Sequence, residues 1–282
     1  MKYYVVIADI HGTRDKLDKA LADVDAWIEI QQKNGTIKID ATIQFIFLGD
    51  YIDRGPDSKY VLAKVKEYVQ ERGAICLIGN HDQFLIGTVE DSKIYFEDQK
   101  AYGSNHVMWL NNGGMKTCVQ MFGIPFDTTG LNSLEIQYKL DLYDYIPIIK
   151  ESEEYKFLKM HGKRKHETDL IFFCHAQQSD PKNVTDDTLL WGRSRDYDKL
   201  DSAFKVPGNK AMSVHGHFHR LSEGINFPRI EHYVHGGKSK TVIMADCGCG
   251  CGTLGQLHPV IICEDSKEMN GIKDYVEIVT IL

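Results

Sequence analysis

The sequence predicts a layered α/β fold, and three observations support this prediction. Short runs rich in β-branched and aromatic residues alternate, through about residue 80, with segments whose apolar residues recur at helical spacing. The C-terminal third contains short apolar runs, glycine turns and no convincing helix. No internal repeat or low-complexity linker divides the chain. Strands alternating with amphipathic helices bury one face of each helix on a sheet, which predicts the layers. Because no repeat or linker divides the chain, we expect a single domain covering residues 1–282.

Each element is justified by its local pattern and by the residues that end it. Asn34-Gly35 and Gly73 end the first two helical patterns, and Gly55-Pro56 separates the second strand from the helix that follows it. The expected elements of the first half are strands at 3–8, 43–48 and 74–78, helices from about Thr13 to Asn34 and from Ser58 to Gly73, and a short helix after His81. Those of the second half are strands at 171–174, 211–214, 241–245, 259–263 and 275–282.

Composition excludes several classes of protein. The chain has 282 residues, of which 43% are hydrophobic and 26% charged, as in ordinary globular proteins. Its net charge of −7 argues against binding to a nucleic-acid backbone, and no apolar run approaches the roughly 18 residues of a membrane span. The apolar part of the N-terminus is too short for a signal peptide, so we expect a cytoplasmic protein. Seven cysteines favour reduced thiols over a disulfide framework.

Candidate metal ligands follow the predicted strands. Three motifs, at residues 9–12, 49–55 and 79–82, each come after an apolar run and place Asp, Asn or His beside glycine. Histidines follow two later strands. The candidate ligands are Asp9, His11, Asp50, Asn80, His175 and His217. Carboxylate, carboxamide and imidazole without thiolate suit a hard-to-borderline divalent ion, and the number of ligands suits a two-metal centre.

The order of these motifs resembles a known family. Asp-x-His-Gly, Gly-Asp-x-x-Asp-Arg-Gly, Gly-Asn-His-Asp, a strand ending in His and then Gly-His is similar to the phosphoprotein phosphatase branch of the calcineurin-like metallophosphoesterases. The segments at 109–114 and 190–193 resemble the bacterial and phage lambda phosphatase type. This resemblance implies a four-layer α/β/β/α sandwich of two mixed sheets, a substrate-specific insertion within about residues 100–169, and two divalent ions, Mn²⁺ first, with Fe or Zn as alternatives.

The resemblance also implies a role for each site residue. The ligands are Asp9 and His11 for one ion, Asp50 for both ions, and Asn80, His175 and His217 for the other. His81 would be the general acid that protonates the leaving oxygen, with Asp53 orienting its ring. Arg54 and Arg193 would bind the phosphate oxygens, because a planar guanidinium matches their geometry.

The implied reaction is direct hydrolysis of a phosphate ester by metal-bound hydroxide, without a phospho-enzyme. No cysteine has an arginine six positions later, so a cysteine-phosphatase loop is absent. Three hypotheses for function stay open. The first is a phosphomonoesterase of the Ser/Thr protein phosphatase type, acting on a phosphorylated protein or a small phosphoester. Protein phosphatases frequently have Glu at the position of Asp82, and this difference weakens the case for a protein substrate. The second is a hydrolase of nucleotides such as diadenosine tetraphosphate, and the third is a non-catalytic binding protein that retains the fold.

Two features near the motifs have no assigned chemistry. Cys and Gly alternate over residues 247–252, without the Cys-x-x-Cys spacing of a structural zinc site. We interpret this segment as a tight glycine loop, and the resemblance places such a loop at the border of the catalytic cleft. His215 and His219 flank His217 at a spacing of two, and we interpret them as part of the polar wall rather than as ligands.

Overall fold

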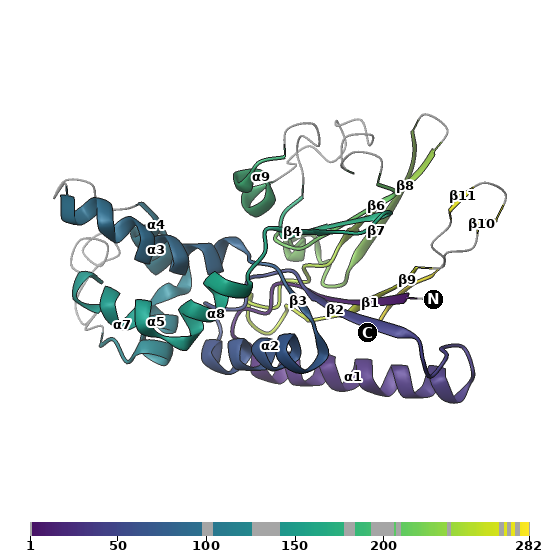
Figure 1. Cartoon of the computed structure of the whole chain (residues 1–282), viewed down its shortest axis with the longest axis horizontal. Helices are drawn as coiled ribbons and strands as arrows, with labels where there is room; N and C mark the ends of the chain where they lie inside the picture. Colours follow the sequence, from purple (N-terminus) through teal and green to yellow (C-terminus); the bar gives the residue numbers. More distant parts are fainter. Residues whose placement is uncertain are drawn as a thin grey trace.

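The computed structural model describes residues 2–97, 104–125, 142–177, 184–192, 206, 210–235, 238–264, 268–269, 272–273 and 277–281. Two five-stranded sheets pack face to face, and helices cover the pair (Figure 1). Both sheets contain parallel and antiparallel pairs, which confirms the predicted fold class of two mixed sheets. Within the described residues, no helix is long and apolar enough to cross a membrane.

The first sheet has β1 at its centre, and its strand order is β12-β9-β1-β2-β3. Its strands are β1 (Lys2–Ile7), β2 (Thr42–Phe47), β3 (Ile75–Cys76), β9 (Val260–Glu264) and β12 (Glu277–Thr280). β1, β2 and β3 run parallel, whereas β9 is antiparallel to both β1 and β12. The three parallel strands therefore end at one edge of the sheet, where the three N-terminal motifs follow them.

Burial on both faces explains why β1 is an unbroken apolar run. Tyr3 and Val5 pack into the core that the first sheet shares with helices, whereas Tyr4 and Val6 lie in a second core between the two sheets. The rings of Tyr4 and Phe173, on opposite sheets, lie 5.4 Å apart between centroids. Alternation of polar and apolar residues is lost when a strand is covered on both sides, as here.

The second sheet has the order β4-β5-β6-β8-β7. Its strands are β4 (Lys165–Glu167), β5 (Ile171–Cys174), β6 (Met212–His215), β7 (Arg229–His235) and β8 (Lys238–Met244). β5, β6 and β8 are parallel, and β4 and β7 are antiparallel edge strands. The chain leaves β5 and β6 at the same edge, so residues 175 and 217 come close together. A separate hairpin pairs β10 (Glu268–Met269) with β11 (Ile272–Lys273).

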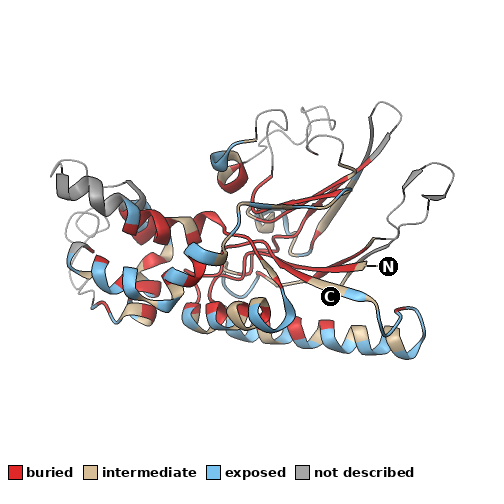
Figure 2. Ribbon diagram, in the orientation of Figure 1, coloured by how far each residue is buried: buried red, intermediate tan, exposed pale blue. Residues whose placement is uncertain are grey.

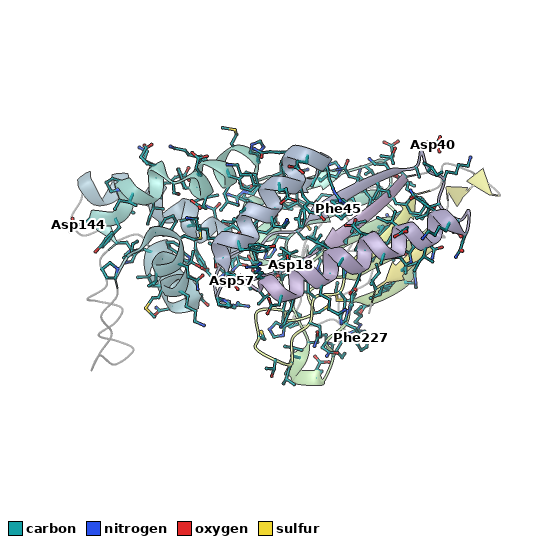
Figure 3. The ribbon with its side chains drawn as sticks, turned by 90° about the horizontal axis from the view of Figure 1, so that it is seen from below. Asp18, Asp40, Phe45, Asp57, Asp144 and Phe227 are labelled. Atoms are coloured by element: carbon teal, nitrogen blue, oxygen red, sulfur yellow. The ribbon has the colours of Figure 1, made fainter. Side chains whose placement is uncertain are left out.

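Helices form the outer layers. α1 (Arg14–Lys33) and α2 (Ser58–Arg72) cover the first sheet, with their exposed faces outward (Figure 2). Figure 3 views this side, where Asp18 of α1 lies near Asp57 at the start of α2; the hydroxyl of Tyr60 donates to Asp18 Oδ1 at 2.8 Å. α9 (Asp186–Trp191) contributes Leu189 to a small core with Phe172 on the outer face of the second sheet. The layers follow the predicted order α/β/β/α.

A helical lobe lies at one end of the sandwich (Figure 1). Its helices are α3 (Asn80–Glu97), α4 (Ser104–Trp109), α5 (Met115–Phe122), α7 (Ile146–Glu151) and α8 (Glu153–His161). The prediction of a short helix after His81 is wrong in two respects, since α3 begins at Asn80 and has 18 residues. The helix can start there because Asp82, in its first turn, accepts the backbone N–H of Gly79 at 2.8 Å. Single-turn 3-10 helices lie at Tyr143–Tyr145 and Leu221–Glu223.

Candidate metal centre and active site

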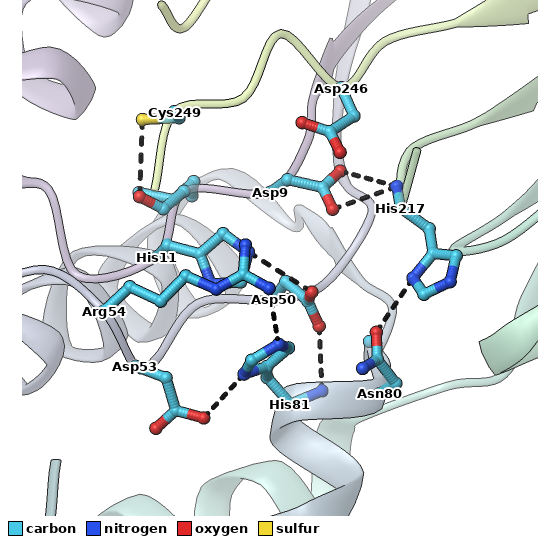
Figure 4. A network of polar contacts seen from close by, with 12 residues as sticks. Asp9, His11, Asp50, Asp53, Arg54, Asn80, His81, His217, Asp246 and Cys249 are labelled. Carbon is cyan, nitrogen blue, oxygen red and sulfur yellow. Dashed lines mark hydrogen bonds and ion pairs between the residues drawn. The ribbon is translucent and has the colours of Figure 1, made fainter. Parts of the chain in front are cut away.

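The loops that follow β1, β2, β3, β5 and β6 meet at one edge of the sandwich (Figure 4). Asp50 is the shared member of two groups of side chains. The ligand atoms of His11, Asp50 and His81 lie within 4.8 Å of one another, and so do those of Asp50, His175 and His217. Asp50 Oδ2 is 3.4 Å from His11 Nε2, and Asp50 Oδ1 is 3.6 Å from His175 Nε2. One carboxylate thus faces both groups, which is the position a bridging ligand needs.

Asn80 completes the second group. Its Oδ1 lies 3.0 Å from His175 Nε2 and 2.9 Å from His217 Nδ1, and the two imidazole nitrogens are 3.2 Å apart. The three atoms come from the start of α3 and from the segments after β5 and β6, and they lie within 3.2 Å of one another. An oxygen and two imidazole nitrogens converging in this way form a donor set that suits a divalent cation.

Hydrogen bonds fix which nitrogen of two histidines is free to bind a cation. Nδ1 of His11 lies 3.0 Å from the carbonyl oxygen of Ile52, and Nδ1 of His175 lies 2.9 Å from that of Leu48. Because a carbonyl oxygen only accepts, both Nδ1 atoms carry hydrogen and each Nε2 keeps a lone pair toward Asp50. Burial lowers the pKa of both rings, which favours the neutral form that binds metals. The residues present therefore fit the implied ions.

Asp9 and Asp246 bring further negative charge to this edge. Both carboxylate oxygens of Asp9 accept the backbone N–H of His217, at 2.9 and 3.0 Å, and Asp246 lies beside Asp9 in Figure 4. Burial, with Asp246 and then Asp50, raises the pKa of Asp9. Burial also raises the pKa of Asp246 to about 7, although the N–H that Gly248 donates to it at 2.8 Å acts to lower this pKa. Three buried carboxylates repel one another unless cations lie among them.

The sequence prediction missed Asp246. A signal was present, since Asp246 follows a predicted strand and precedes a Cys-Gly dipeptide, much as Asp9 and Asp50 follow theirs.

Asp53 holds the ring of His81. Asp53 Oδ2 lies 2.7 Å from His81 Nδ1, and the Asp53 carboxylate also accepts from Thr117 Oγ1 at 2.6 Å and from Trp109 Nε1 at 3.0 and 3.1 Å. Burial raises the pKa of Asp53, but these donors stabilise its charged form. For His81, burial lowers the pKa while Asp50 and Asp53 raise it, and the net shift is upward. A charged imidazolium is the form that can donate a proton.

The guanidinium of Arg54 lies between the imidazoles of His11 and His81. Nη1 is 3.0 Å from His11 Nε2 and Nη2 is 3.0 Å from His81 Nε2. Because a guanidinium only donates, His81 Nε2 accepts from Arg54 in the neutral form of the ring and not in the charged form. Lys116 Nζ donates to the carbonyl of Arg54 at 2.9 Å, and a Cβ on Gly113 would lie 2.8 Å from Arg54 N. The kink between α4 and α5 thus supports Arg54. The second predicted phosphate ligand, Arg193, lies outside the described residues.

Backbone strain is concentrated at the site. Among the described residues, the non-glycine residues with positive φ are Asp9, His11, Asp50, Asp53, Arg54 and His217, with φ between +49° and +73°. All of them are predicted site residues. Left-handed backbone is disfavoured for side chains with a Cβ and persists only where the surroundings hold it. Here the loops are held by close contact: a Cβ on Gly49 would lie 2.2 Å from Gly79 N.

Asp82 ties two of these loops together. Its carboxylate accepts the backbone N–H groups of Asp50 at 2.7 Å, Tyr51 at 3.1 Å and Gly79 at 2.8 Å. Burial and Asp50 raise the pKa of Asp82 to about 8, and the three donors act in the opposite direction. Since the side chain is fully buried and faces backbone, Asp in place of Glu bears on loop geometry rather than on the choice of substrate.

Comparisons with known proteins agree with this geometry. Residues 3–221 match the family described as calcineurin-like phosphoesterase. A stretch of 89 residues is 35% identical to the asymmetrical bis(5'-nucleosyl)-tetraphosphatase PrpE of Oceanobacillus iheyensis. It covers 32% of this chain and 34% of that protein, so the chain spans about a third of that relative's length.

Two solved structures are similar at low identity. The cold-active protein-tyrosine phosphatase of a Shewanella species is 16% identical, with a TM-score of 0.47, over 93% of this chain and 77% of that one. A protein serine/threonine phosphatase of Saccharomyces cerevisiae is 12% identical, with a TM-score of 0.46, over 99% and 79%. From the match over residues 3–221, the chain belongs to the calcineurin-like phosphoesterases.

Proposed function

We propose that this protein hydrolyses phosphate monoesters in one displacement step at a centre of two divalent ions. The observation that carries the proposal is the position of Asp50 between His11 on one side and His175 and His217 on the other, with the His81–Asp53 pair beside it. Asp9 and His11 would hold one ion, Asp50 both, and Asn80, His175 and His217 the other. When bound, the ions supply an activated water and positive charge for the phosphate oxygens. We propose Mn²⁺ for both sites, with Fe or Zn as alternatives.

The protein's own side chains would act on the leaving oxygen and on the non-bridging oxygens of the phosphate. His81, held through Nδ1 by Asp53, presents Nε2 toward the space that Arg54 also faces. From there it would donate a proton to the leaving oxygen. Arg54 has two N–H groups within reach of that space and would turn them to the non-bridging oxygens of the phosphate. Arg193 is the second residue we propose for this task.

The acid favours a substrate with a poor leaving group. Protonation by a positioned imidazolium gains roughly 10²–10⁴-fold, and this gain matters most for an alkoxide such as that of serine. We therefore place a phosphorylated protein or small alkyl phosphoester first, as in Ser/Thr protein phosphatases. The relative PrpE supports a dinucleoside polyphosphate as the second candidate. A non-catalytic binding protein is disfavoured, because the six ligand candidates and His81 are all retained. A cytoplasmic location stays a prediction.

The test is to compare three substrates on the metal-free protein supplied with Mn²⁺: a phosphoserine peptide, p-nitrophenyl phosphate and diadenosine tetraphosphate. The highest kcat/KM on the peptide supports the first candidate, and the highest on the nucleotide supports the second. No turnover of any of the three with Mn²⁺, Fe²⁺ or Zn²⁺ would support the non-catalytic alternative and overturn the proposal.

A further inference from the structure

The loop of residues 247–255, named here the Cys/Gly loop, joins β8 to β9 and takes no part in the proposed chemistry. Lys16 of α1 holds it. The ammonium of Lys16 donates to three carbonyl oxygens of the loop, those of Cys249 at 2.9 Å, Gly252 at 3.0 Å and Gly255 at 2.7 Å. An ammonium has three donors, so this set uses all of them. Such a complete set is a specific contact rather than a chance approach of a surface lysine.

The place of Lys16 in its helix strengthens this conclusion. Lys16 lies in the first turn of α1, where the helix dipole disfavours a positive charge. An acidic residue would be preferred there for helix stability alone. The three carbonyls of the Cys/Gly loop offset the unfavourable position. Lys16 is therefore explained by what it binds across the chain rather than by the helix that carries it.

The Cys/Gly loop in turn contacts the Asp-x-His motif. Cys249 Sγ lies 2.7 Å from Thr13 Oγ1 and 3.4 Å from the carbonyl oxygen of Ile10. Gly250 packs directly against His11, because a Cβ there would lie 2.7 Å from both Cβ and Cγ of His11. Burial raises the pKa of the Cys249 thiol to about 11, which favours a protonated hydrogen-bonding group over a metal-binding thiolate.

The start of the same loop sets the position of Asp246. Gly248 donates its N–H to Asp246 Oδ1 at 2.8 Å, and the N–H of Gln256 donates to the carbonyl of Cys247 at 3.1 Å. The loop is thus closed on itself between Asp246 and Gln256. A shift of the loop would therefore disturb both the carboxylate of Asp246, which Gly248 holds, and the contact of Gly250 with His11, whose φ is +49° (Figure 4 shows Asp246 and His11).

We infer that Lys16 is a positioning residue of the metal centre, which acts through the Cys/Gly loop to hold His11 and Asp246 in place. The inference rests on the proposed function, since it presupposes that the centre holds two ions. On this inference, Lys16 affects the ion site that contains His11. Asn80, His175 and His217 have their own contacts from other loops.

The test is the binding of Mn²⁺ to metal-free protein, followed by the loss of the free-ion EPR signal. In Lys16→Met, which keeps the length of the side chain and removes the charge, we expect one of the two sites to weaken about 10–100-fold, as for other groups that orient metal ligands. The other site is expected to keep its affinity. Lys19→Met is the matched control, because Lys19 is exposed on the same helix and, within the part of the chain that the structure describes, its ion pair is with Asp23, at 2.5 Å. Gly250→Ala, which pushes on His11 directly, is expected to weaken the same site.

Three outcomes would overturn the inference. The first is Lys16→Met with both affinities as in the wild type. The second is an equal weakening of both sites together with a fall in the melting temperature of the metal-free protein, which would show a merely structural role. The third is a wild-type protein that binds none of the three proposed ions, Mn²⁺, Fe²⁺ or Zn²⁺; this outcome alone would also overturn the proposed function, so the two failures can be told apart.

Discussion

The two ring nitrogens of His81 have different partners, and this division defines its proposed role. Nδ1 is held by Asp53, whose carboxylate is itself fixed by Thr117 and Trp109. Nε2 faces the guanidinium of Arg54. A ring held on one side by a buried carboxylate can deliver a proton from the other side without losing its orientation.

Replacing His81 should therefore have an effect that depends on the leaving group. In His81→Ala we expect kcat for a phosphoserine peptide to fall about 10²–10⁴-fold. The loss on p-nitrophenyl phosphate should be much smaller, because nitrophenolate leaves without protonation. Steady-state kinetics on both substrates, with Mn²⁺ stoichiometry checked, measures this. An equal loss on the two substrates would contradict the acid role.

Replacing Asp53 should shift the pH dependence. Asp50 and Asp53 raise the pKa of His81 against the effect of burial, so Asp53→Asn should lower it. The proton donor is the charged ring, and activity on an alkyl phosphoester is lost as pH rises through the pKa of His81. In Asp53→Asn the alkaline limb of the kcat profile should therefore move to lower pH. A limb that stays in place would rule out Asp53 as the group that sets this pKa.

At the scale of single elements, the start of α3 fixes the geometry of segments that follow other elements. Asp82, in the first turn of α3, accepts three N–H groups from the loops after β2 and β3. It fixes Asp50 at its left-handed φ of +55°. A side chain at the start of one element thus sets the geometry of the bridging ligand in another.

Asp82→Asn should weaken both stability and metal binding. The amide group of Asn replaces one acceptor by a donor, so at least one buried N–H loses its partner at a cost of about 1–3 kcal/mol. We expect a lower melting temperature without metal and weaker Mn²⁺ binding, measured by calorimetry. Asp40→Asn, the same change at an exposed position, is the control and should behave as the wild type. If the two variants are equally stable, Asp82 does not tie the loops.

The edge strand β4 should add a pH dependence of stability. His166 stacks on Phe173 at 5.8 Å, and burial, with Lys163 and Lys2, lowers its pKa while Glu167 raises it. The folded state then binds fewer protons than the unfolded state below about pH 6.5, so stability falls as pH drops through that value toward the folded pKa. When the pH is lowered from 7.5 to 5.5, the melting temperature of His166→Gln should fall less than that of the wild type. The same loss in both proteins would exclude His166 as the source.

At the scale of the whole molecule, the site joins the two sheets. Asp9 and Asp50 follow strands of the first sheet, and His175 and His217 follow strands of the second. Cations bound among them would link the sheets at this edge. They would also offset the repulsion among Asp9, Asp50 and Asp246.

Metal removal should therefore destabilise the protein. A ligand that binds only the folded state adds about 2.7 kcal/mol at a free concentration 100 times its Kd. We expect EDTA to lower the melting temperature and added Mn²⁺ to restore it in a concentration-dependent way, measured by scanning calorimetry. His81→Ala, which removes no proposed ligand, should respond like the wild type. If EDTA leaves the melting temperature unchanged, this result would argue against bound ions.

Features that depend on local sequence patterns could be predicted, whereas contacts between residues far apart in the chain could not. Each ligand candidate could be predicted because it lies in a short segment that follows an apolar strand, and parallel strands bring such segments to one edge. The four layers came from the family resemblance. Lys16 could not be predicted, because its three acceptors lie 233 to 239 residues away and none has a sequence pattern. The start of α3 was placed too late because Asp82 was not recognised as its N-terminal anchor.

The pairing of β1 has a consequence for how the protein is made. β1 has β2 on one side and β9 on the other, and β9 begins only at Val260. At about 5–20 residues per second, the stretch between β2 and β9 takes roughly 10–40 s to synthesise. Throughout that time the newly made chain presents one unpaired edge of β1, an apolar strand that is open there to pairing with other chains. We expect chaperone binding to nascent chains to persist until residues 260–264 have emerged, which ribosome profiling of chaperone-bound chains would reveal.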